Sequence, residues 1–585
     1  MSAVVDDLVP ATRGSWRALW PYARPDLRLW VVAFATAPIG TALTIAQPFA
    51  MKQAIDGHVL TGDIPGLRRV ALLYLLAVLA GFAAETVYNM AIARAAIGTI
   101  SRVRTAVYRH SLHLGQTWFD RVPTGRLLTR ATSDIEALGE TLTAGAVTLV
   151  FDALMVVGIL CAMLAMNAKL TLALLLVAPP LALSVDVIRR QLRRLFTEAR
   201  AALSDLTGFT SERLSGVAVI QLNSDEARAL AGFDRRLAPY RHASVVSNLW
   251  DGLLFALVDG VSAMSLALLL WFAAGDWFGG FATAGLLAAF IDYLGKLFTP
   301  IREFSGKVAV LQRAAASLEQ IFGLLGHDEP DALTHGGAAL SGPPAPVVLR
   351  DVRFGYAPGN DVIHGLDLVI RPGEVVAVVG RTGSGKSTLA RLLLKVYTGY
   401  RGHITLRGAE LAALSAEDVR RAIGVVAQDV VLFPGEVRFN LSLGAPISDA
   451  ALEAAIELAC ATTVVQRLGG LGGRVEHGGA NLSAGEAQLL AFARVLAHDP
   501  PMVILDEATA AVDTLTEAAI QRATEALLAR KTVLVIAHRL TTVARADLIA
   551  VLHAGRVVES GTHTELLAAG GRYADLVAHA LENTA

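Results

Sequence analysis

Residues 380–387 read Gly380-Arg381-Thr382-Gly383-Ser384-Gly385-Lys386-Ser387, which is a complete G-x-x-x-x-G-K-S phosphate-binding loop. The apolar run 375–379 before it predicts a strand, and the amphipathic run 388–397 after it predicts a helix. In this context backbone N–H groups surround phosphate oxygens, the lysine reaches the β- and γ-phosphates, and the following hydroxyl binds Mg²⁺. The loop therefore predicts a nucleotide-binding α/β domain.

The composition of the chain changes sharply near residue 330, so we expect at least two domains in its 585 residues. Hydrophobic residues make up 54% and charged residues 18%, which is more apolar than a typical soluble protein. The net charge of -1 gives no argument for nucleic-acid binding. Cys161 and Cys460 lie far apart and imply neither a disulfide framework nor a metal cluster. The N-terminus, with Asp6 and Asp7, does not have the pattern of a cleaved signal.

Six apolar stretches are long enough to span a bilayer, which takes about 20 residues each. We place them near 29–51, 70–93, 141–166, 168–188, 250–275 and 277–300. The connections between the second and third spans, and between the fourth and fifth, are long and keep a helical pattern.

Arginines orient these spans through the positive-inside rule. They cluster before the first span, after the second and after the fourth, whereas the opposite side has Arg68, Arg69 and Lys169. We expect both long connections, both termini and the C-terminal domain to be cytoplasmic, in a multi-pass protein of the cytoplasmic membrane. The clustered residues are Arg13, Arg17, Arg24, Arg28, Arg94, Arg102, Arg104, Arg109, Arg189, Arg190, Arg193 and Arg194.

Several ionisable residues fall within the spans, where charge is costly and faces water or a partner group. One interpretation is a substrate path with negative character; the other is that they are protonated, wetted or paired residues that tie helices together. Asp152, Asp259 and Asp292 lie nearest the middle of their spans, and the remaining three are Glu85, Asp251 and Lys296.

Short β-rich runs alternate with helices from about Val347, after a linker marked by Gly336-Gly337 and Pro343-Pro344. The apolar run 503–505 ends in Asp506, placed to support Mg²⁺ through water, and Glu507, placed to polarise an attacking water. An exposed acidic pair is the alternative. The segment 481–486 precedes a helix predicted to begin near Ala487, and it is suited to a phosphate or is an ordinary helix cap.

These motifs, taken in order, resemble those of the ATP-binding cassette (ABC) domain: Tyr356, the phosphate loop, Gln428, Leu482 to Glu486, Asp506-Glu507, Asp513 and His538. With six preceding spans, the chain resembles a half-transporter of the bacterial multidrug and lipid exporter group. The segments Trp118-Phe119-Asp120, Gly125-Arg126-Leu127, Arg130 and Asp134 are similar to the first cytoplasmic loop of that group. The segments 212–216 and 219–221 are similar to the second.

The resemblance implies a role for each of these residues. Tyr356 would stack on adenine, Gln428 would sense Mg²⁺ and the γ-phosphate, and His538 would contact the γ-phosphate. Catalysis is assigned to Glu507, His538, Gln428 and Lys386, and metal binding to Ser387, Gln428 and Asp506. Nucleotide binding is assigned to Tyr356, Gly380, Arg381, Thr382, Gly383, Ser384, Gly385, Lys386, Ser387, Thr388, Ser483, Gly485 and Asp513.

The signature segment departs from the Leu-Ser-Gly-Gly-Gln pattern of the family, since it reads Leu482-Ser483-Ala484-Gly485-Glu486. Ala484 restricts the backbone where glycine is usual, and Glu486 brings a carboxylate near a phosphate, so we expect weaker engagement of the partner's nucleotide. An intact catalytic set with an altered signature resembles one subunit of a heterodimeric exporter. We favour a heterodimer, and a homodimer stays open.

The sequence thus predicts an all-α six-helix membrane domain followed by an α/β P-loop nucleotide-binding domain. We expect an N-terminal elbow at 1–28, the membrane domain at 29–325, a linker at 326–346 and the cassette at 347–585. The expected function is ATP-driven export of small amphiphilic or hydrophobic solutes, drugs or lipids, with ATP and Mg²⁺ and a second half-transporter. The alternatives are a homodimeric lipid flippase and an importer of a metal chelate built on the same fold. A gated channel is a further alternative, although nothing in the sequence recommends it.

Overall fold

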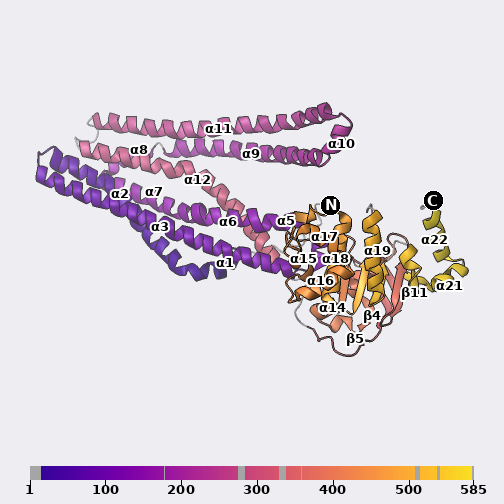
Figure 1. Cartoon of the computed structure of the whole chain (residues 1–585). Helices are drawn as coiled ribbons and strands as arrows, with labels where there is room; N and C mark the ends of the chain where they lie inside the picture. Colours follow the sequence, from indigo (N-terminus) through magenta and orange to yellow (C-terminus); the bar gives the residue numbers. More distant parts are fainter. Residues whose placement is uncertain are drawn as a thin grey trace. The chain divides into compact units, whose positions relative to one another are not determined.

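The computed structural model of the chain describes residues 15–176, 178–274, 283–327, 337–357, 359–506, 514–536 and 540–582 (Figure 1). The chain divides into two compact units. The first comprises Met1–Arg109 and Gly125–His327, and the second comprises His110–Thr124 and Asp328–Ala585. A short segment from the middle of the membrane half therefore belongs to the unit that holds the nucleotide-binding domain.

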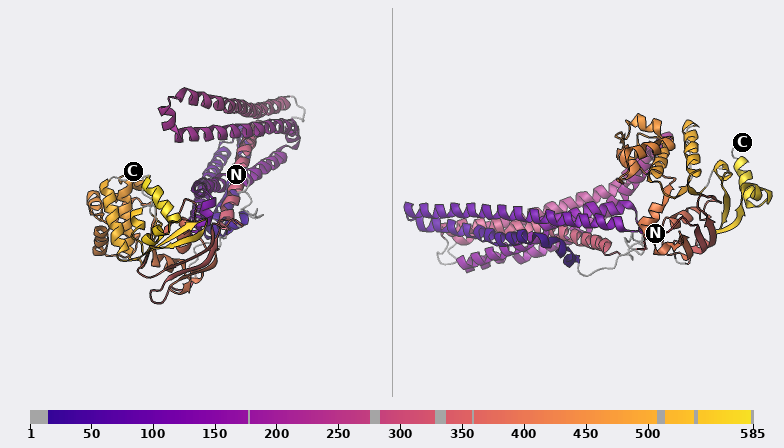
Figure 2. Two further views of the ribbon diagram at one scale, coloured as in Figure 1. Left: turned by 90° about the vertical axis from the view of Figure 1, so that its right-hand side faces the viewer. Right: turned by 60° about the horizontal axis from the view of Figure 1, so that its bottom comes forward.

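The first unit is all helical. Its helices α9 and α11 form a long antiparallel pair, joined by the short helix α10, and they stay side by side in every view (Figures 1 and 2). Helix α12 packs against α2, α7 and α11. The main helices are α1 (Ser15–Ala23), α2 (Leu27–Ala54), α3 (Ile64–His113), α5 (Thr124–Thr129), α6 (Ile135–Glu140), α7 (Ala146–Met166), α8 (Ala168–Leu175), α9 (Ala178–Ser215), α10 (Val217–Leu222), α11 (Glu226–Ala274) and α12 (Ala284–Leu325).

Six helical stretches in the described part of the chain are long and apolar enough to cross a bilayer, as the sequence predicts. The predicted sixth span, 277–300, begins outside the described residues, and the stretch of α12 that meets the criterion is Gly306–Leu325. Helix α3 exposes large apolar side chains such as Leu73 and Phe82, which are 64% and 70% exposed. Such a surface is stable against lipid and costly in water.

The predicted fourth span, 168–188, lies within the apolar helical stretch Ala168–Ser215. Helix α8 ends at Leu175 and α9 begins at Ala178, and residue 177 between them lies outside the described residues.

The second unit is built on two sheets. A six-stranded sheet has the order β12-β11-β3-β10-β9-β6 and is parallel except for the edge strand β12. Its strands are β3 (Val375–Val379), β6 (Ile423–Val426), β9 (Met502–Asp506), β10 (Thr532–Ile536), β11 (Leu548–His553) and β12 (Arg556–Gly561). A four-stranded antiparallel sheet has the order β2-β1-β4-β5, formed by β1 (Val347–Phe354), β2 (Ile363–Ile370), β4 (Arg401–Leu406) and β5 (Ala409–Glu410).

The phosphate-binding loop leaves the centre of the parallel sheet. Strand β3 lies between β11 and β10, and all of its side chains are buried. The loop then enters helix α13 (Lys386–Leu393). Because the carboxyl ends of parallel strands meet at one edge of a sheet, the residues after β3, β6 and β9 share this edge.

Candidate nucleotide-binding site

The backbone of the phosphate-binding loop requires glycine at two positions. Gly380 has φ of 155°, and a Cβ there would lie 2.3 Å from the carbonyl oxygen of Leu552 and 2.8 Å from Ser384 Oγ. Gly385 has φ of 105° in the left-handed region and forms the N-cap of α13. These two glycines let the loop fold tightly around the space in front of the helix N-terminus.

Two side chains of this loop are suited to hold a phosphate. The buried Ser384 Oγ has no hydrogen-bond partner among the described residues. Lys386, 6% exposed, donates from Nζ to the carbonyl oxygens of Gly380 at 2.6 Å and Arg381 at 3.1 Å. Burial lowers the pKa of the Lys386 ammonium, while Asp506 acts in the opposite direction. A buried unpaired hydroxyl beside a buried cation fits an anionic ligand.

Two further predicted residues come to the same edge of the sheet. Asp506 is the last residue of β9, next to β10, which in turn lies beside β3. Gln428 is exposed shortly after β6, the neighbour of β9. Ser387 is exposed in the first turn of α13. The oxygen atoms of these three side chains are of the type that Mg²⁺ prefers. Three predicted residues, Glu507, Asp513 and His538, lie outside the described residues.

Tyr356, which is predicted to stack on adenine, lies beside helix α13, which follows this loop. Its hydroxyl forms a 2.8 Å hydrogen bond with Thr388 Oγ1 on α13, so the ring is anchored to the helix that follows the loop. The residue is 43% exposed. Phe354 and Tyr397 pack edge-on against it, each with ring centroids 5.3 Å away.

Tyr397 is a contact residue that the sequence did not reveal. The predicted helix 388–397 ends at Leu393, and Lys395 adopts a positive φ of 50°, which turns the chain out of the helix. Tyr397 is 2% exposed, and its hydroxyl donates to a carboxylate oxygen of Asp120 on helix α4 (Gln116–Arg121). Burial, together with the hydrogen bond to Asp120, raises the pKa of the Tyr397 hydroxyl. The motif Trp118-Phe119-Asp120 predicts the loop but gives no signal for Tyr397, the residue that donates to Asp120.

The signature segment forms the start of helix α18 (Ala484–His498), three residues earlier than predicted. Ser483 is the N-cap: its Oγ accepts from the Glu486 N–H at 3.2 Å, and a Glu486 carboxylate oxygen accepts from the Ser483 N–H at 2.8 Å. This is a capping box. Ala484 is the first helical residue and does not have a positive φ, so the expected backbone restriction does not strain this turn.

The carboxylate of Glu486 has a second partner. Arg467, on helix α17 (Thr462–Leu468), donates to it at 2.8 Å and also donates to the carbonyl oxygen of Asn481 at 3.3 Å. Partial burial works to raise the pKa of Glu486, but the Ser483 N–H and the Arg467 guanidinium outweigh it, and the pKa is lowered. The carboxylate is therefore ionised and already compensated.

Two lysines of the membrane unit, Lys307 and Lys296, pair with acidic residues, the first across helices and the second within α12. Lys307 on α12 donates to Asp152 on α7 at 2.5 Å, and Lys296 donates to Asp292 at 2.9 Å and to Gln47 Oε1 on α2 at 3.3 Å. For Asp152 and Lys296, the structure favours the interpretation in which polar contacts tie helices together.

The two halves of the chain match two family models. Residues 30–301 match the ABC transporter transmembrane region, and residues 363–510 match ABC transporter. An uncharacterized ABC transporter ATP-binding protein of Bacillus subtilis, YfiC, is 31% identical over 97% of this chain and 94% of its own length. The chain belongs to the ABC transporter family.

Other relatives of this transporter are named for a function. An ATP-dependent lipid A-core flippase of Chromohalobacter salexigens is 32% identical over 96% of this chain and 97% of its own length. A probable multidrug resistance ABC transporter of Bacillus subtilis, YheH, is 32% identical over 81% of this chain and 71% of its own length. A solved bacterial Atm1-family ABC exporter with ATP bound superposes with a TM-score of 0.74 at 28% identity, covering 94% of this chain and 98% of the other. The transporter is an ATP-hydrolysing membrane protein of half-transporter form.

Proposed function

We propose that this transporter uses ATP hydrolysis to export amphiphilic or hydrophobic solutes, drugs or lipids, across the cytoplasmic membrane. The observation that carries the proposal is the placement of His110–Thr124 in the nucleotide-binding unit, where Asp120 bonds to the buried Tyr397. Helix α3 is continuous from its apolar stretch to His113, and α4 begins at Gln116. A change at the nucleotide site therefore has a covalent and hydrogen-bonded route to a spanning helix.

The chemistry assigned to the site follows from its donors. The loop N–H groups, the Ser384 hydroxyl and the Lys386 ammonium bind and orient the phosphates, and the Tyr356 ring stacks on the base. A bound Mg²⁺ would draw charge from the phosphate oxygens, held through Ser387 and Asp506 with Gln428 near it. Glu507 is proposed to accept the proton of the attacking water, and His538 to contact the γ-phosphate.

The proposal predicts that Glu507→Gln binds ATP but turns it over slower by orders of magnitude, because the proton has no acceptor. The measurement is ATPase activity and nucleotide binding of the purified transporter in liposomes. Near-normal turnover would refute the role of Glu507. If neither ATP consumption nor ATP binding occurs in the unmodified transporter, the proposed function itself fails.

We propose that two such chains, or this chain and a similar one, assemble through their cytoplasmic ends. Helix α10 exposes Val219 by 64% and Leu222 by 86%, with the acidic residues Asp225 and Glu226 following it. An exposed apolar tip of this kind, at the end of a long helix pair, is typical of a protein–protein contact site.

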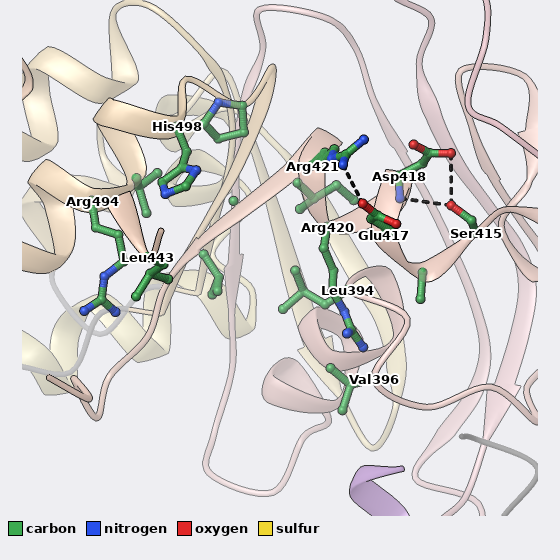
Figure 3. A pocket seen from close by; sticks show the side chains of 16 residues that line it. Leu394, Val396, Ser415, Glu417, Asp418, Arg420, Arg421, Leu443, Arg494 and His498 are labelled. Carbon is green, nitrogen blue, oxygen red and sulfur yellow. Dashed lines mark hydrogen bonds and ion pairs between the residues drawn. The ribbon is translucent and has the colours of Figure 1, made fainter. Parts of the chain in front are cut away.

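A groove in the cassette fits that tip. It has a volume of about 970 Å³ and is lined by apolar side chains, including Leu394, Val396 and Leu443, with Arg420 and Arg494 at its walls (Figure 3). Arg494 is held by donation to the carbonyl oxygens of Asn440 at 2.7 Å and Val431 at 3.1 Å. The groove lining also includes Glu417 and Asp418, and Asp225 next to the tip is paired with Arg228, so the match is between apolar surfaces. We propose that this groove receives helix α10 of the second subunit.

We propose that the second subunit is a different chain, because an intact phosphate loop together with an altered signature resembles one subunit of a heterodimeric exporter. Ala484 is unstrained in the helix and Glu486 is paired with Arg467, so the proposal rests on this resemblance and not on a weakened turn. The test is to express the chain alone and with its adjacent candidate subunit, and to measure native mass and ATPase activity. A stable and fully active dimer of this chain alone would refute the heterodimer.

Direction and cargo are tested separately. Accumulation of a fluorescent amphiphile in inverted vesicles is expected for an exporter, and its depletion would indicate an importer. Movement of a labelled lipid between leaflets, without release into water, would indicate a flippase, as the lipid A-core flippase relatives are named.

A further inference from the structure

The signature turn carries a negative charge at a place where a nucleotide phosphate would approach. The Glu486 carboxylate is 23% exposed and receives two donors, the backbone N–H of Ser483 and the guanidinium of Arg467. Arg467 also donates to the carbonyl oxygen of Asn481, two residues before Ser483. One arginine therefore links α17 to both sides of the cap.

We propose that Arg467 is a positioning residue of the signature: it holds Glu486 against the helix N-terminus and cancels its charge, so that the turn accepts the γ-phosphate of ATP bound to the other subunit. This inference rests on the proposed function, in which two cassettes share each nucleotide. Arg467 acts through Glu486 and is not itself a catalytic residue.

The geometry leaves the turn able to bind. Ser483 Oγ accepts the Glu486 N–H, which uses an oxygen lone pair, so its hydrogen is available to donate to a phosphate oxygen. The α18 N-terminus adds a partial positive charge at the same point. Without Arg467, the carboxylate would cancel that partial charge and repel the phosphate. A like charge several ångströms away in a partly wetted site corresponds to about a tenfold loss of affinity.

A purely structural role for Arg467 makes a different prediction from an electrostatic one. If the arginine merely fastens α17 to the turn, removing the charge of Glu486 cannot compensate for its loss. If it cancels charge, the same removal restores binding. Glutamine at 486 keeps the side-chain oxygen that caps Ser483, so the turn itself is preserved.

The experiment measures Mg·ATP binding by the purified dimer containing this chain, in the Glu507→Gln background. Arg467→Met is expected to weaken about tenfold the binding at each site that faces this chain's signature. Arg467→Met combined with Glu486→Gln is expected to return to within about twofold of the parent, and Arg467→Lys, which keeps the charge, is expected to stay close to the parent.

The matched control is Arg438→Met, which breaks an exposed bidentate ion pair with Asp449 elsewhere in the same unit. It is expected to leave binding unchanged. Two results would overturn the inference, provided that the parent binds ATP. One is that the effects of Arg467→Met and Glu486→Gln on binding are additive, and the other is that Arg467→Met leaves binding unchanged. If Arg467→Met does not fold, equal binding by Glu486→Gln and the parent would overturn it, because an unopposed Arg467 should strengthen binding. A parent dimer that binds no nucleotide would instead refute the proposed function.

Discussion

Lys386 in the nucleotide-binding unit and Lys307 in the membrane unit are both largely buried, but their partners differ. Lys386 donates to two neutral carbonyl oxygens of its own loop, whereas Lys307 donates to the carboxylates of Asp152 and Glu303 at 2.5 and 2.9 Å. Carbonyl oxygens compensate a buried ammonium poorly, so an incoming phosphate gains a strong interaction. The Lys307 charge is already neutralised, and its pairing connects α12 to α7. The same residue type thus marks a ligand site in one unit and a helix contact in the other.

The largest expected effect comes from removing the lysine of the loop. Lys386→Ala should weaken ATP binding about 100-fold or more, because several charge-assisted hydrogen bonds to the phosphates are lost. Titration of a fluorescent ATP analogue into the purified transporter measures this. Lys395→Ala is the matched control, since Lys395 is a lysine of the same unit that donates to the Ala412 carbonyl oxygen at 3.0 Å and is expected to leave nucleotide binding unchanged. Equal affinities for Lys386→Ala and the parent would remove the contrast between the two lysines.

The next effect tests the paired charges of the membrane unit. Asp152→Ala should destabilise the transporter by about 1–2 kcal/mol, because Lys307 loses its cross-helix partner but keeps the carboxylate of Glu303 on its own helix. Asp152→Leu combined with Lys307→Met should recover most of this loss. Thermal unfolding in detergent or nanodiscs provides the measurement.

The substrate-path interpretation of Asp152 makes the opposite prediction. Asp152→Asn would then leave thermal stability unchanged but abolish the stimulation of ATPase activity by cationic amphiphiles. That result would place Asp152 with Lys386 as a ligand-binding group.

The sequence predicts features whose residues are close together in the chain, and it does not predict contacts between residues that are far apart in it. The phosphate loop, the strand before it and the six apolar stretches are continuous in sequence, and their pattern or spacing was sufficient. Tyr397 and Asp120 are 277 residues apart, and Lys307 and Asp152 are 155 apart. A single sequence holds no signal for such pairings, since they depend on how helices and strands pack. The prediction for Ala484 is wrong for a local reason. The sequence predicts that helix α18 begins near Ala487, but it begins at Ala484, so this residue has an ordinary helical backbone and not a restricted one.

A smaller effect is expected from the hydrogen bond between Tyr397 and Asp120, which follows helix α3 in the chain. Tyr397→Phe removes the hydroxyl that donates to the exposed carboxylate of Asp120, which water can then solvate, so the cost in stability is about 0.5–1 kcal/mol. ATP binding should change little, but stimulation of ATPase activity by transported solutes should fall severalfold. Tyr400→Phe is the matched control, since Tyr400 donates to the Glu410 carboxylate at 3.4 Å within the cassette. Equal stimulation in both variants would contradict a role for Asp120 in coupling.

The smallest expected effect is the pH dependence of ATP binding. It tests whether Lys386, unlike Lys307, is a buried ammonium that has no anionic partner until a phosphate binds. Burial lowers the pKa of Lys386, so in the nucleotide-free protein this ammonium loses its proton at a lower pH than an ordinary lysine. A bound phosphate favours the charged form and raises the pKa again, so binding takes up a proton when the pH exceeds the pKa of the free protein. Affinity should then fall as pH rises toward the ordinary pKa range of lysine, by at most tenfold per pH unit. Lys386→Arg keeps its charge over this range and should bind with a flat profile, although more weakly at neutral pH because the guanidinium does not fit the loop. Parallel profiles for the parent and Lys386→Arg would show that the lysine stays fully protonated, and that burial in the loop does not create a poorly compensated charge.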